Sequence, residues 1–393
     1  MCVRIIVLLV FVTFLSCEKK PDKAKESTVK DIEGNVSEFA VNFAPLTTVY
    51  KKKTADDLEL FFNERLNTND FSGAFLAAKN GAILFENYSG YAYKEKGDTI
   101  KNDTPLHIAS VSKVITAVAV LKLVEAKKLQ LTDLVCKYLP EFPHKETTIE
   151  MLLSHRSGLR NYAYFTNEKG VWNTQNVLKN EDILTILATK NIALESVPGT
   201  RFGYCNTNYA LLALVIEKVA SKKYDLVLQE LIFNPLGMKN TFVFQDLEQQ
   251  ENVSQSYKGK YKRLAFEYLD AVYGDKNIYS TARDLLQFDL ALYSDNFLSK
   301  SLKELMFKGY SYEKKGVKNY GLGIRMLEFE TGQKYFFHNG WWHGNTASYV
   351  TLQKDSVTII AISNKFTRKT YQTKRLAPQF GDYPFKFNDE EGE

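Results

Sequence analysis

The stretch Ile108-Ala109-Ser110-Val111-Ser112-Lys113 joins a strand-like approach to a long apolar helix that the sequence predicts over residues 111–126. Residues three apart on a helix share a face, so the Lys113 amine can reach the Ser110 hydroxyl. A serine needs a base beside it to act as a nucleophile, and a lysine whose pKa is lowered by desolvation can be that base. The N-terminus of the helix favours developing negative charge. The stretch therefore predicts a reactive serine at the start of a buried helix.

The Ser-x-x-Lys spacing alone leaves a second interpretation open. The same spacing begins at positions 16, 27 and 311, in the N-terminal apolar junction, a polar run and another polar run. Only Ser110 and Lys113 begin a long apolar helix. A capped helix with a surface lysine would produce the same pattern.

Two further motifs favour the catalytic interpretation. Tyr204-Cys205-Asn206 follows a Pro-Gly turn and precedes a helix, which places a phenol beside an amide at a helix start. A phenol close to an ammonium can relay protons. His338-Asn339-Gly340 ends a strand pattern, where a glycine lets a substrate backbone approach closely. Each motif occurs once in the sequence.

The arrangement of predicted elements indicates an α+β fold. Strands are predicted over residues 71–79 and 83–88 around an Asn80-Gly81 hairpin turn, and again between residues 321 and 363. Helices are predicted over 54–67 and 281–292, and they dominate residues 131–233. This order suits a central antiparallel sheet built from both ends of the chain and flanked by helices, with an inserted, mostly helical subdomain at about 125–275.

Composition limits the possible functions. The chain has 393 residues, 45% of them hydrophobic and 25% charged, as expected for a globular protein. A formal net charge of +5 without a basic stripe argues against nucleic-acid binding. The sequence has no HExxH or CxxC pattern and its five histidines are scattered, so neither a metal site nor another cofactor is expected.

The N-terminus predicts export and a lipid anchor. Residues 1–16 combine Arg4 with a short apolar block, which is typical of a signal peptide. The block is too short to span a bilayer, and Cys17, directly before a polar run, resembles the lipidated cysteine of a bacterial lipobox. We expect a flexible tether over 17–50, a globular domain over 51–380 and an acidic disordered tail over 381–393. The protein would then be held at the periplasmic or surface face of the cell envelope, with the membrane as a partner through the lipid.

The three motifs, in this order, resemble the serine β-lactamase and penicillin-binding-protein superfamily, and specifically its class C-like branch. That branch includes class C β-lactamases, D-stereospecific peptidases and esterases. The flanking runs 152–159, 234–238, 278–285 and 320–323 are similar to the family as well. The resemblance covers roughly residues 71–364. The GxSxG motif of α/β-hydrolases is absent, which disfavours that fold.

The resemblance implies a role for each motif residue. Ser110 would form an acyl-enzyme with an ester, amide or D-peptide carbonyl, activated by Lys113 and Tyr204. Asn206 would orient Lys113 and the substrate amide. The group that acts as general base stays open, because coupled groups titrate together.

The third motif would supply the remaining contacts. Backbone N–H groups of Ser110 and Trp341, next to Gly340, would hold the oxyanion, and His338 would lie near Tyr204 and the leaving group. The substrate would be a small molecule or a peptide, including peptides derived from the cell wall.

One departure from the family bears on the substrate. Class C β-lactamases have a charged lysine where this chain has His338, which is mostly neutral at pH 7. The bulky Trp341-Trp342 pair follows directly. Both features shift the expectation from β-lactamase towards esterase or peptidase. A catalytically weak module that binds cell-wall peptides and a true β-lactamase remain the alternatives.

Four other residues carry expectations of their own. His155 is interpreted as a buried structural histidine that organises a turn, and Asp284 as part of a helix N-terminus. Cys205 is interpreted as a small packing residue inside the Tyr204 loop. Trp341 is expected to line an apolar substrate cleft.

Overall fold

The computed structural model describes residue 39, residues 41–68 and residues 71–385, all within one compact unit of the chain, residues 31–393. The predicted signal peptide, the lipidation site Cys17 and residues 386–393 lie outside the described residues. No helix in the described part of the chain is both long and apolar enough to cross a lipid bilayer.

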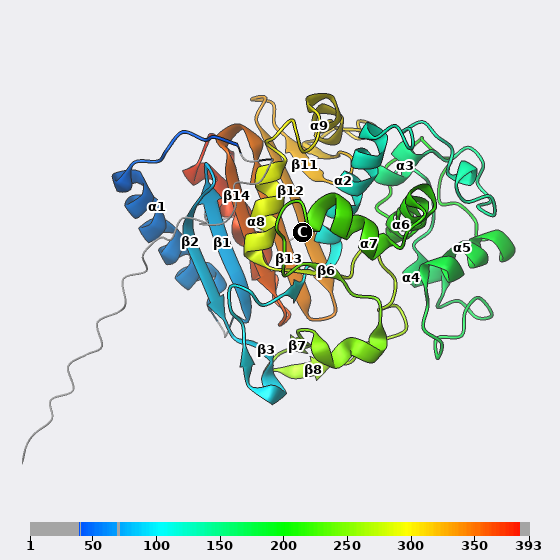
Figure 1. Cartoon of the computed structure of the whole chain (residues 1–393), viewed down its shortest axis with the longest axis horizontal. Helices are drawn as coiled ribbons and strands as arrows, with labels where there is room; N and C mark the ends of the chain where they lie inside the picture. The colour runs from blue at the N-terminus through cyan, green and yellow to red at the C-terminus, as the bar shows by residue number, and fades with distance from the viewer. Residues whose placement is uncertain (1–38, 40, 69–70, 386–393) are drawn as a thin grey trace, which may run out of the picture. The chain divides into compact units, whose positions relative to one another are not determined.

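A seven-stranded antiparallel sheet forms the centre of the fold, as the sequence predicts (Figure 1). Strands from the two ends of the chain pair directly within this sheet, where Gly73 pairs with Ser363 and Lys79 with Val357. In spatial order, the strands are β10 (Lys318–Tyr320), β11 (Arg325–Glu328), β12 (Lys334–Trp342), β13 (Asn345–Leu352), β14 (Val357–Ser363), β1 (Gly73–Lys79) and β2 (Ala82–Ser89).

The turn between β1 and β2 confirms the predicted hairpin. Asn80 and Gly81 have φ angles of 50° and 75°. Two consecutive left-handed residues define the turn type whose twist matches that of paired strands, and Asn-Gly is its preferred sequence. The turn thus fixes the register of the N-terminal hairpin.

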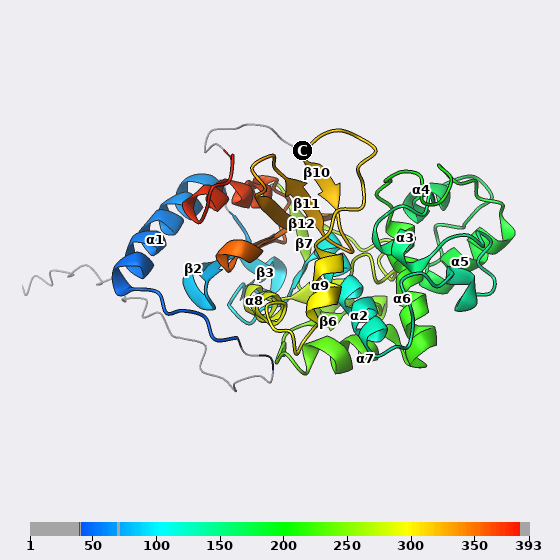
Figure 2. The same ribbon diagram turned by 90° about the horizontal axis from the view of Figure 1, so that it is seen from above.

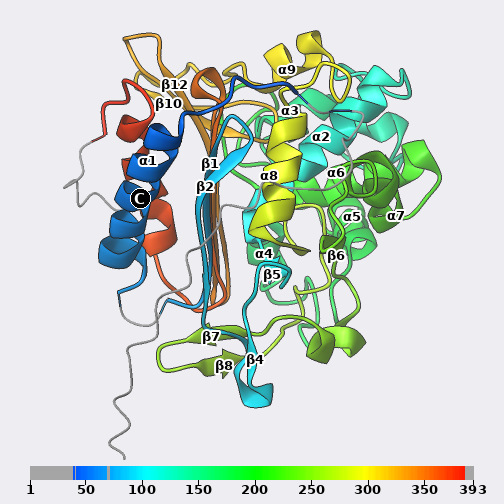
Figure 3. The ribbon, with the colours of Figure 1, turned by 60° about the vertical axis from the view of Figure 1, so that its left-hand side comes forward.

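Helices cover both faces of the sheet, and each face has its own core (Figures 2 and 3). On one face, α1 (Thr48–Phe61), a π-helical turn (Phe62–Leu66) and the C-terminal 3-10 helix (Lys369–Gln379) enclose aromatic side chains such as Phe62 and Phe75. On the other face lie α8 (Ala282–Ala291) and α2 (Ser112–Glu125). Thr281 caps α8 by accepting a hydrogen bond from the Asp284 N–H, as expected.

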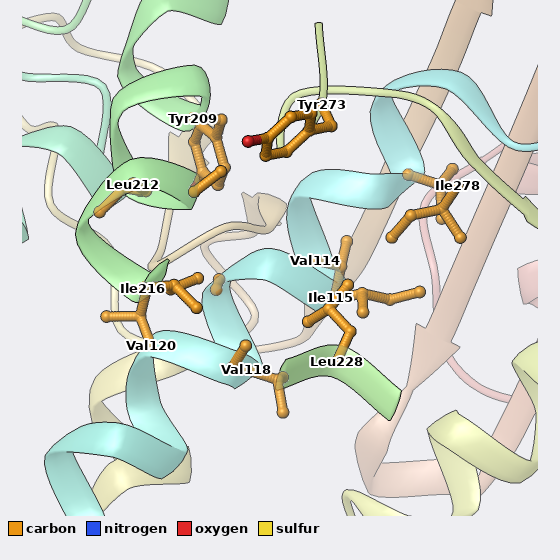
Figure 4. Close-up of a cluster of buried hydrophobic side chains, with 14 of the residues drawn as sticks. Val114, Ile115, Val118, Val120, Tyr209, Leu212, Ile216, Leu228, Tyr273 and Ile278 are labelled. Atoms are coloured by element: carbon orange, nitrogen blue, oxygen red, sulfur yellow. The ribbon is translucent and has the colours of Figure 1, made fainter. Parts of the chain in front are cut away.

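The helical region between α2 and β9 packs on α2 from the side away from the sheet. In Figure 4, Val120 of α2 lies beside Ile216 of α6, and both belong to the main hydrophobic core. Each fully buried aliphatic side chain of this kind stabilises the fold by roughly 1.5–3 kcal/mol. The remaining helices are α3 (Ile149–Leu153), α4 (Tyr162–Phe165), α5 (Asn180–Thr189), α6 (Asn206–Ala220), α7 (Tyr224–Leu228) and α9 (Lys300–Met306).

Three small sheets complete the described part of the chain. The first contains β5 (Leu106–His107), β9 (Ile278–Ser280) and β6 (Phe242–Val243), and it leads the chain to Ser110. The other two are formed by β3 (Tyr91–Tyr93) with β4 (Asp98–Thr99) and by β7 (Ser256–Lys258) with β8 (Lys262–Leu264).

Two predicted segment boundaries differ from the structure: the end of the N-terminal tether and the start of the C-terminal tail. The first helix begins at Thr48, capped by Thr47, and the Phe39 and Phe43 rings already pack against Phe297 and Tyr293. The predicted tether over 17–50 therefore extends too far. The predicted disordered tail over 381–393 begins too early, because Phe385 stacks edge-on against Tyr335.

Candidate active site

The segment before Ser110 is held in a strained backbone conformation. Ala109 has a φ of 48°, which costs a non-glycine residue roughly 1–2 kcal/mol. The buried His107 ring supports this conformation, since its Nδ1 accepts a hydrogen bond of 3.2 Å from the Ala109 N–H and its Nε2 bonds Asn277 at 3.0 Å. Burial lowers the pKa of His107 to about 4, so its ring is neutral. The neutral ring therefore presents one acceptor and one donor, as both bonds require.

Ser110 and Lys113 are in contact, as the sequence predicts. The Lys113 Nζ donates a hydrogen bond of 3.1 Å to Ser110 Oγ and another of 2.7 Å to the carbonyl oxygen of Asp275. Lys113 is 0% exposed, whereas Ser110 keeps part of its surface accessible. The alternative of a capped helix with a surface lysine is therefore excluded. A buried amine 3.1 Å from a partly open hydroxyl is a suitable arrangement for proton transfer.

Tyr204 lies beside the lysine, in the loop before α6. The Lys113 Nζ is 5.1 Å from the centre of its ring. The His155 ring packs on it with centroids 4.4 Å apart, and the Arg325 guanidinium carbon lies 4.7 Å from its centroid. The phenol ring is thus held among a lysine, a histidine and an arginine that come from three separate parts of the chain.

His155 is a buried structural residue, as expected. Its Nδ1 accepts a hydrogen bond of 3.2 Å from the Cys205 N–H and contacts Asn208 Nδ2 at 3.1 Å. Burial, followed by the positive charge of Lys113, holds the pKa of His155 well below its usual value. The neutral ring thereby holds the Tyr204 loop in place through the Cys205 N–H. Cys205 is also buried, and burial raises the pKa of its thiol to about 11, which keeps the thiol protonated and unreactive.

Asn206 is the first residue of α6, but it does not make the predicted bond to Lys113. Its Oδ1 is buried and has no hydrogen-bond partner. An unpaired buried acceptor is costly, roughly 1–3 kcal/mol, and such groups in native proteins call for an explanation. A substrate N–H is one donor that could satisfy it.

His338 is close to Tyr204 but does not open to the cleft. The two ring centroids are 6.2 Å apart, yet the imidazole is completely buried. Its Nδ1 bonds the Asn339 carbonyl, which can only accept, so Nε2 accepts from the Tyr320 hydroxyl at 3.1 Å. We expected His338 to lie near Tyr204 and the leaving group: it does lie near Tyr204, but its completely buried ring supports the site as an internal residue. Burial, then the charges of Arg325 and Lys113, hold the pKa of His338 well below its usual value.

Gly340 brings β12 against the backbone of the nucleophile segment. A Cβ atom at this position would lie 2.5 Å from the Ile108 carbonyl oxygen and 3.1 Å from the Ser110 backbone nitrogen. Only glycine therefore permits this approach, as expected from the third motif. It brings strand β12 against the Ser110 backbone nitrogen, as expected if backbone N–H groups of both segments hold one oxyanion.

The side chain of Trp341 is not where it was expected. Successive side chains on a strand point to opposite faces, so Gly340 and Trp342 share the face of β12 that meets Ser110, and Trp341 points to the other. Trp341 is 62% exposed, and its ring lies 6.5 Å from that of Phe366. The prediction that the Trp341 ring lines the cleft is therefore wrong. The strand pattern was expected to end at His338, which left the alternation beyond it undetermined.

Three functional neighbours were not found by reasoning from the sequence. Asp275 binds Lys113 through its backbone carbonyl, which no residue pattern can signal. Tyr320 bonds His338 across two strands, and Arg325 reaches Tyr204 from the start of β11. The Tyr320-Gly321-Leu322-Gly323 run resembles the family, and Arg325 follows it by two residues. This closeness in sequence was the only signal that could have pointed to Tyr320 and Arg325 as site residues. Among the described residues, no group of three or more His, Cys, Asp or Glu side chains could hold a metal ion.

Comparisons with known proteins agree with this geometry. The Beta-lactamase family profile matches residues 58–378. The chain is 30% identical to Penicillin-binding protein 4* of Bacillus subtilis over 339 residues, which is 82% of this chain and 74% of that protein. It is 25% identical to D-aminopeptidase of Brucella anthropi over 299 residues, 74% of this chain and 56% of that protein.

The fold is found in solved structures as well. A penicillin binding protein from Bacillus halodurans superposes with a TM-score of 0.71 at 21% identity, covering 82% of this chain and 99% of the other. From the family match and from the serine, lysine and tyrosine gathered at one site, it follows that the chain belongs to the beta-lactamase family of serine hydrolases.

Proposed function

We propose that this hydrolase cleaves an ester, amide or D-peptide carbonyl through an acyl-enzyme on Ser110. The observation that carries the proposal is the 3.1 Å contact between the buried Lys113 amine and the accessible Ser110 hydroxyl. Because this amine is completely buried and lies within hydrogen-bonding distance of the hydroxyl, it is placed to accept the serine proton. Tyr204, 5.1 Å from that amine at its ring centre, is the second group able to carry the proton.

The reaction has two halves. In the first, Ser110 Oγ forms a bond to the carbonyl carbon while its proton passes to the Lys113–Tyr204 pair. The bond to the leaving group then breaks, and the same proton passes to the leaving oxygen or nitrogen. In the second half, water attacks the acyl carbon, the bond to Ser110 Oγ breaks and the water proton returns to the serine. The products are an acid and an alcohol or amine.

The oxyanion would be held by the backbone N–H groups of Ser110 and Trp341. The close approach of Gly340 to Ser110 supports this role. Losing one such donor typically costs about 10²–10³ in rate. Asn206 would accept a hydrogen bond from a substrate amide, because its buried Oδ1 lacks a partner among the described residues.

Arg325 bears on the choice between substrates. His338 is neutral, so it does not replace the charged lysine of class C β-lactamases. Arg325 nevertheless lies 4.7 Å from the Tyr204 ring, and its Nε is buried without a partner. The positively charged Arg325 side chain would bind substrates that carry an anionic group near the scissile bond, such as peptides with a free carboxylate. D-Aminopeptidase activity in a relative is in keeping with a peptide substrate.

A substrate panel tests the proposal against its alternatives. Purified wild type and Ser110→Ala are assayed on a p-nitrophenyl ester, a D-peptide and the chromogenic cephalosporin nitrocefin. We expect wild type to hydrolyse the ester or the D-peptide and Ser110→Ala to be inactive. Hydrolysis of nitrocefin well above that of the ester would favour a true β-lactamase. Retained binding of a cell-wall peptide without any turnover would favour the binding module.

We also propose that the protein is exported and anchored through lipid on Cys17. The support is the abrupt change from an apolar block to a polar run at this cysteine. Cells grown with a labelled fatty acid should incorporate the label into the wild-type protein and not into Cys17→Ser. Equal labelling, or a Cys17→Ser protein that stays in the membrane fraction, would contradict the anchor.

A further inference from the structure

Trp342 lies on the face of β12 that meets the nucleophile, two residues beyond Gly340. A strand rises about 3.3 Å per residue, so the Trp342 side chain leaves the strand about 7 Å from the point where Gly340 touches the Ser110 backbone. The indole is half-buried and packs partly on the main core. A partly accessible aromatic side chain therefore stands on the face of β12 that meets the nucleophile segment.

The two sides of Gly340 along β12 differ in chemistry. On the side before Gly340, Tyr204 packs near the buried His338, with ring centroids 6.2 Å apart. In the proposed reaction, the leaving group receives its proton from the Lys113–Tyr204 pair, so it departs on that side. The acyl part of the substrate must then extend past Gly340 towards Trp342.

We propose that Trp342 forms the wall of the acyl side of the cleft and selects substrates whose acyl group carries an apolar, preferably aromatic, substituent. The inference rests on the proposed function, because the direction of the substrate follows from the role of Tyr204. Aromatic rings favour offset or edge-on contacts with other rings beyond the area that they bury. An acetyl group is too small to reach this wall.

The indole is clamped in place, as a selective wall requires. Its Nε1 donates a hydrogen bond to Asp270 Oδ1. The ammonium of the buried Lys276 lies 4.6 Å from the ring centre, where it covers part of one ring face by a cation–π contact. Lys276 is itself held by a 2.5 Å hydrogen bond to the Tyr162 hydroxyl. Preorganised side chains discriminate more sharply because ordering them costs nothing at the moment of binding.

Asp270, which holds the indole, is fixed from two further sides. His343 Nε2 contacts both of its carboxylate oxygens at 3.1 Å, and the Glu267 N–H donates to Oδ2. Burial alone would raise the pKa of Asp270, but the bond from His343 and the other hydrogen bonds hold it below its usual value. The backbone of Asp270 also bonds Asn277, whose side chain contacts His107 behind Ser110. Asp270 thus supports the Trp342 indole directly and the segment before Ser110 through Asn277 and His107.

An acyl series tests the inference with the full-length protein. We compare kcat/KM for p-nitrophenyl phenylacetate and p-nitrophenyl acetate, which share a leaving group. Wild type should prefer the phenylacetyl ester, and Trp342→Ala should lower this preference roughly three- to tenfold, the range of one aromatic contact. Trp342→Leu, which keeps apolar volume, is measured alongside and serves in its place if the alanine variant does not fold. The matched control is Phe366→Ala, an exposed aromatic whose variant should keep the wild-type ratio.

The possible results are distinguishable. A wild type that hydrolyses neither ester contradicts the proposed function and the inference with it. A wild type that hydrolyses both esters, with a ratio that Trp342→Ala and Trp342→Leu leave unchanged, overturns the inference alone. An equal loss of preference in Phe366→Ala would also overturn it, because the effect would then not belong to the clamped indole.

Discussion

Adding one methyl group at Gly340 should disable the site without unfolding the protein. The new Cβ would lie 2.5 Å from the Ile108 carbonyl oxygen, 3.0 Å from the Ala109 Cβ and 3.1 Å from the Ser110 backbone nitrogen. Two of these three neighbours are backbone atoms that cannot rotate away. Strand β12 and the segment that carries Ser110 must therefore separate.

The size of the separation sets the expected loss. Ordinary contact begins at 3.4 Å, so the strand and the Ile108 carbonyl must move apart by about 0.9 Å. A displacement of this order in a catalytic arrangement can cost about 10² in rate, which corresponds to about 2.7 kcal/mol of transition-state stabilisation. We expect Gly340→Ala to lower kcat/KM about 100-fold for the best ester of the panel.

The assay needs a control for glycine substitution itself. Gly203 lies next to Tyr204, and a Cβ there would meet no other atom of the described residues within 4 Å. Gly203→Ala should keep kcat/KM within about twofold of wild type, in line with a surface substitution away from special features. Thermal unfolding confirms that both variants are folded. A folded Gly340→Ala enzyme with wild-type kcat/KM would refute the close approach of β12 to Ser110.

Three further predictions follow from the same geometry. Lys113→Met should lower kcat by about 10²–10⁴ while the unfolding free energy stays the same or rises, because it removes the base and replaces a buried polar side chain by an apolar one of similar length; a fall in stability with retained kcat would contradict this. Arg325→Gln should weaken kcat/KM for a D-peptide with a free carboxylate about tenfold or more, yet change a neutral ester little; equal effects on both would exclude a role in charge recognition. The pKa of His107 is about 4 in the folded state and about 6.5 in the unfolded state. Between these pH values the unfolded state binds more protons, so acidification lowers the unfolding free energy. The total loss from this group is about 3 kcal/mol. Burial raises the pKa of Asp289 to about 6, and this group changes stability in the opposite direction. The measurement is therefore the unfolding free energy against pH for wild type and for His107→Gln. Identical pH slopes for the two proteins would contradict the prediction.

Local sequence signals predicted the elements that depend on neighbouring residues. The Asn80-Gly81 turn, the buried helix α2 and the Thr281 cap of α8 were all confirmed, because each is decided by residues within one or two turns. The start of α1 was missed. Thr47 caps it, and the lysine run that follows faces solvent without an apolar period.

The site was predictable only in part for a similar reason. The Ser110–Lys113 contact lies within one helical turn, so spacing alone gives it. Arg325 and Tyr320 reach the site through the pairing of β10, β11 and β12, and sequence spacing does not fix that register. The strand pattern was expected to end at His338, so the alternation of side chains beyond it was undetermined, and the Trp341 ring was assigned to the cleft.

Covalent labelling of Ser110 is the most direct measurement of the central claim, that a buried amine activates this hydroxyl. A fluorophosphonate probe is incubated with wild type, Ser110→Ala and Lys113→Met, and the labelled peptide is identified by mass spectrometry. The account predicts rapid labelling of wild type on the peptide that contains Ser110, slow labelling of Lys113→Met and none of Ser110→Ala. Equal labelling of wild type and Ser110→Ala, or a label on another residue, would contradict it.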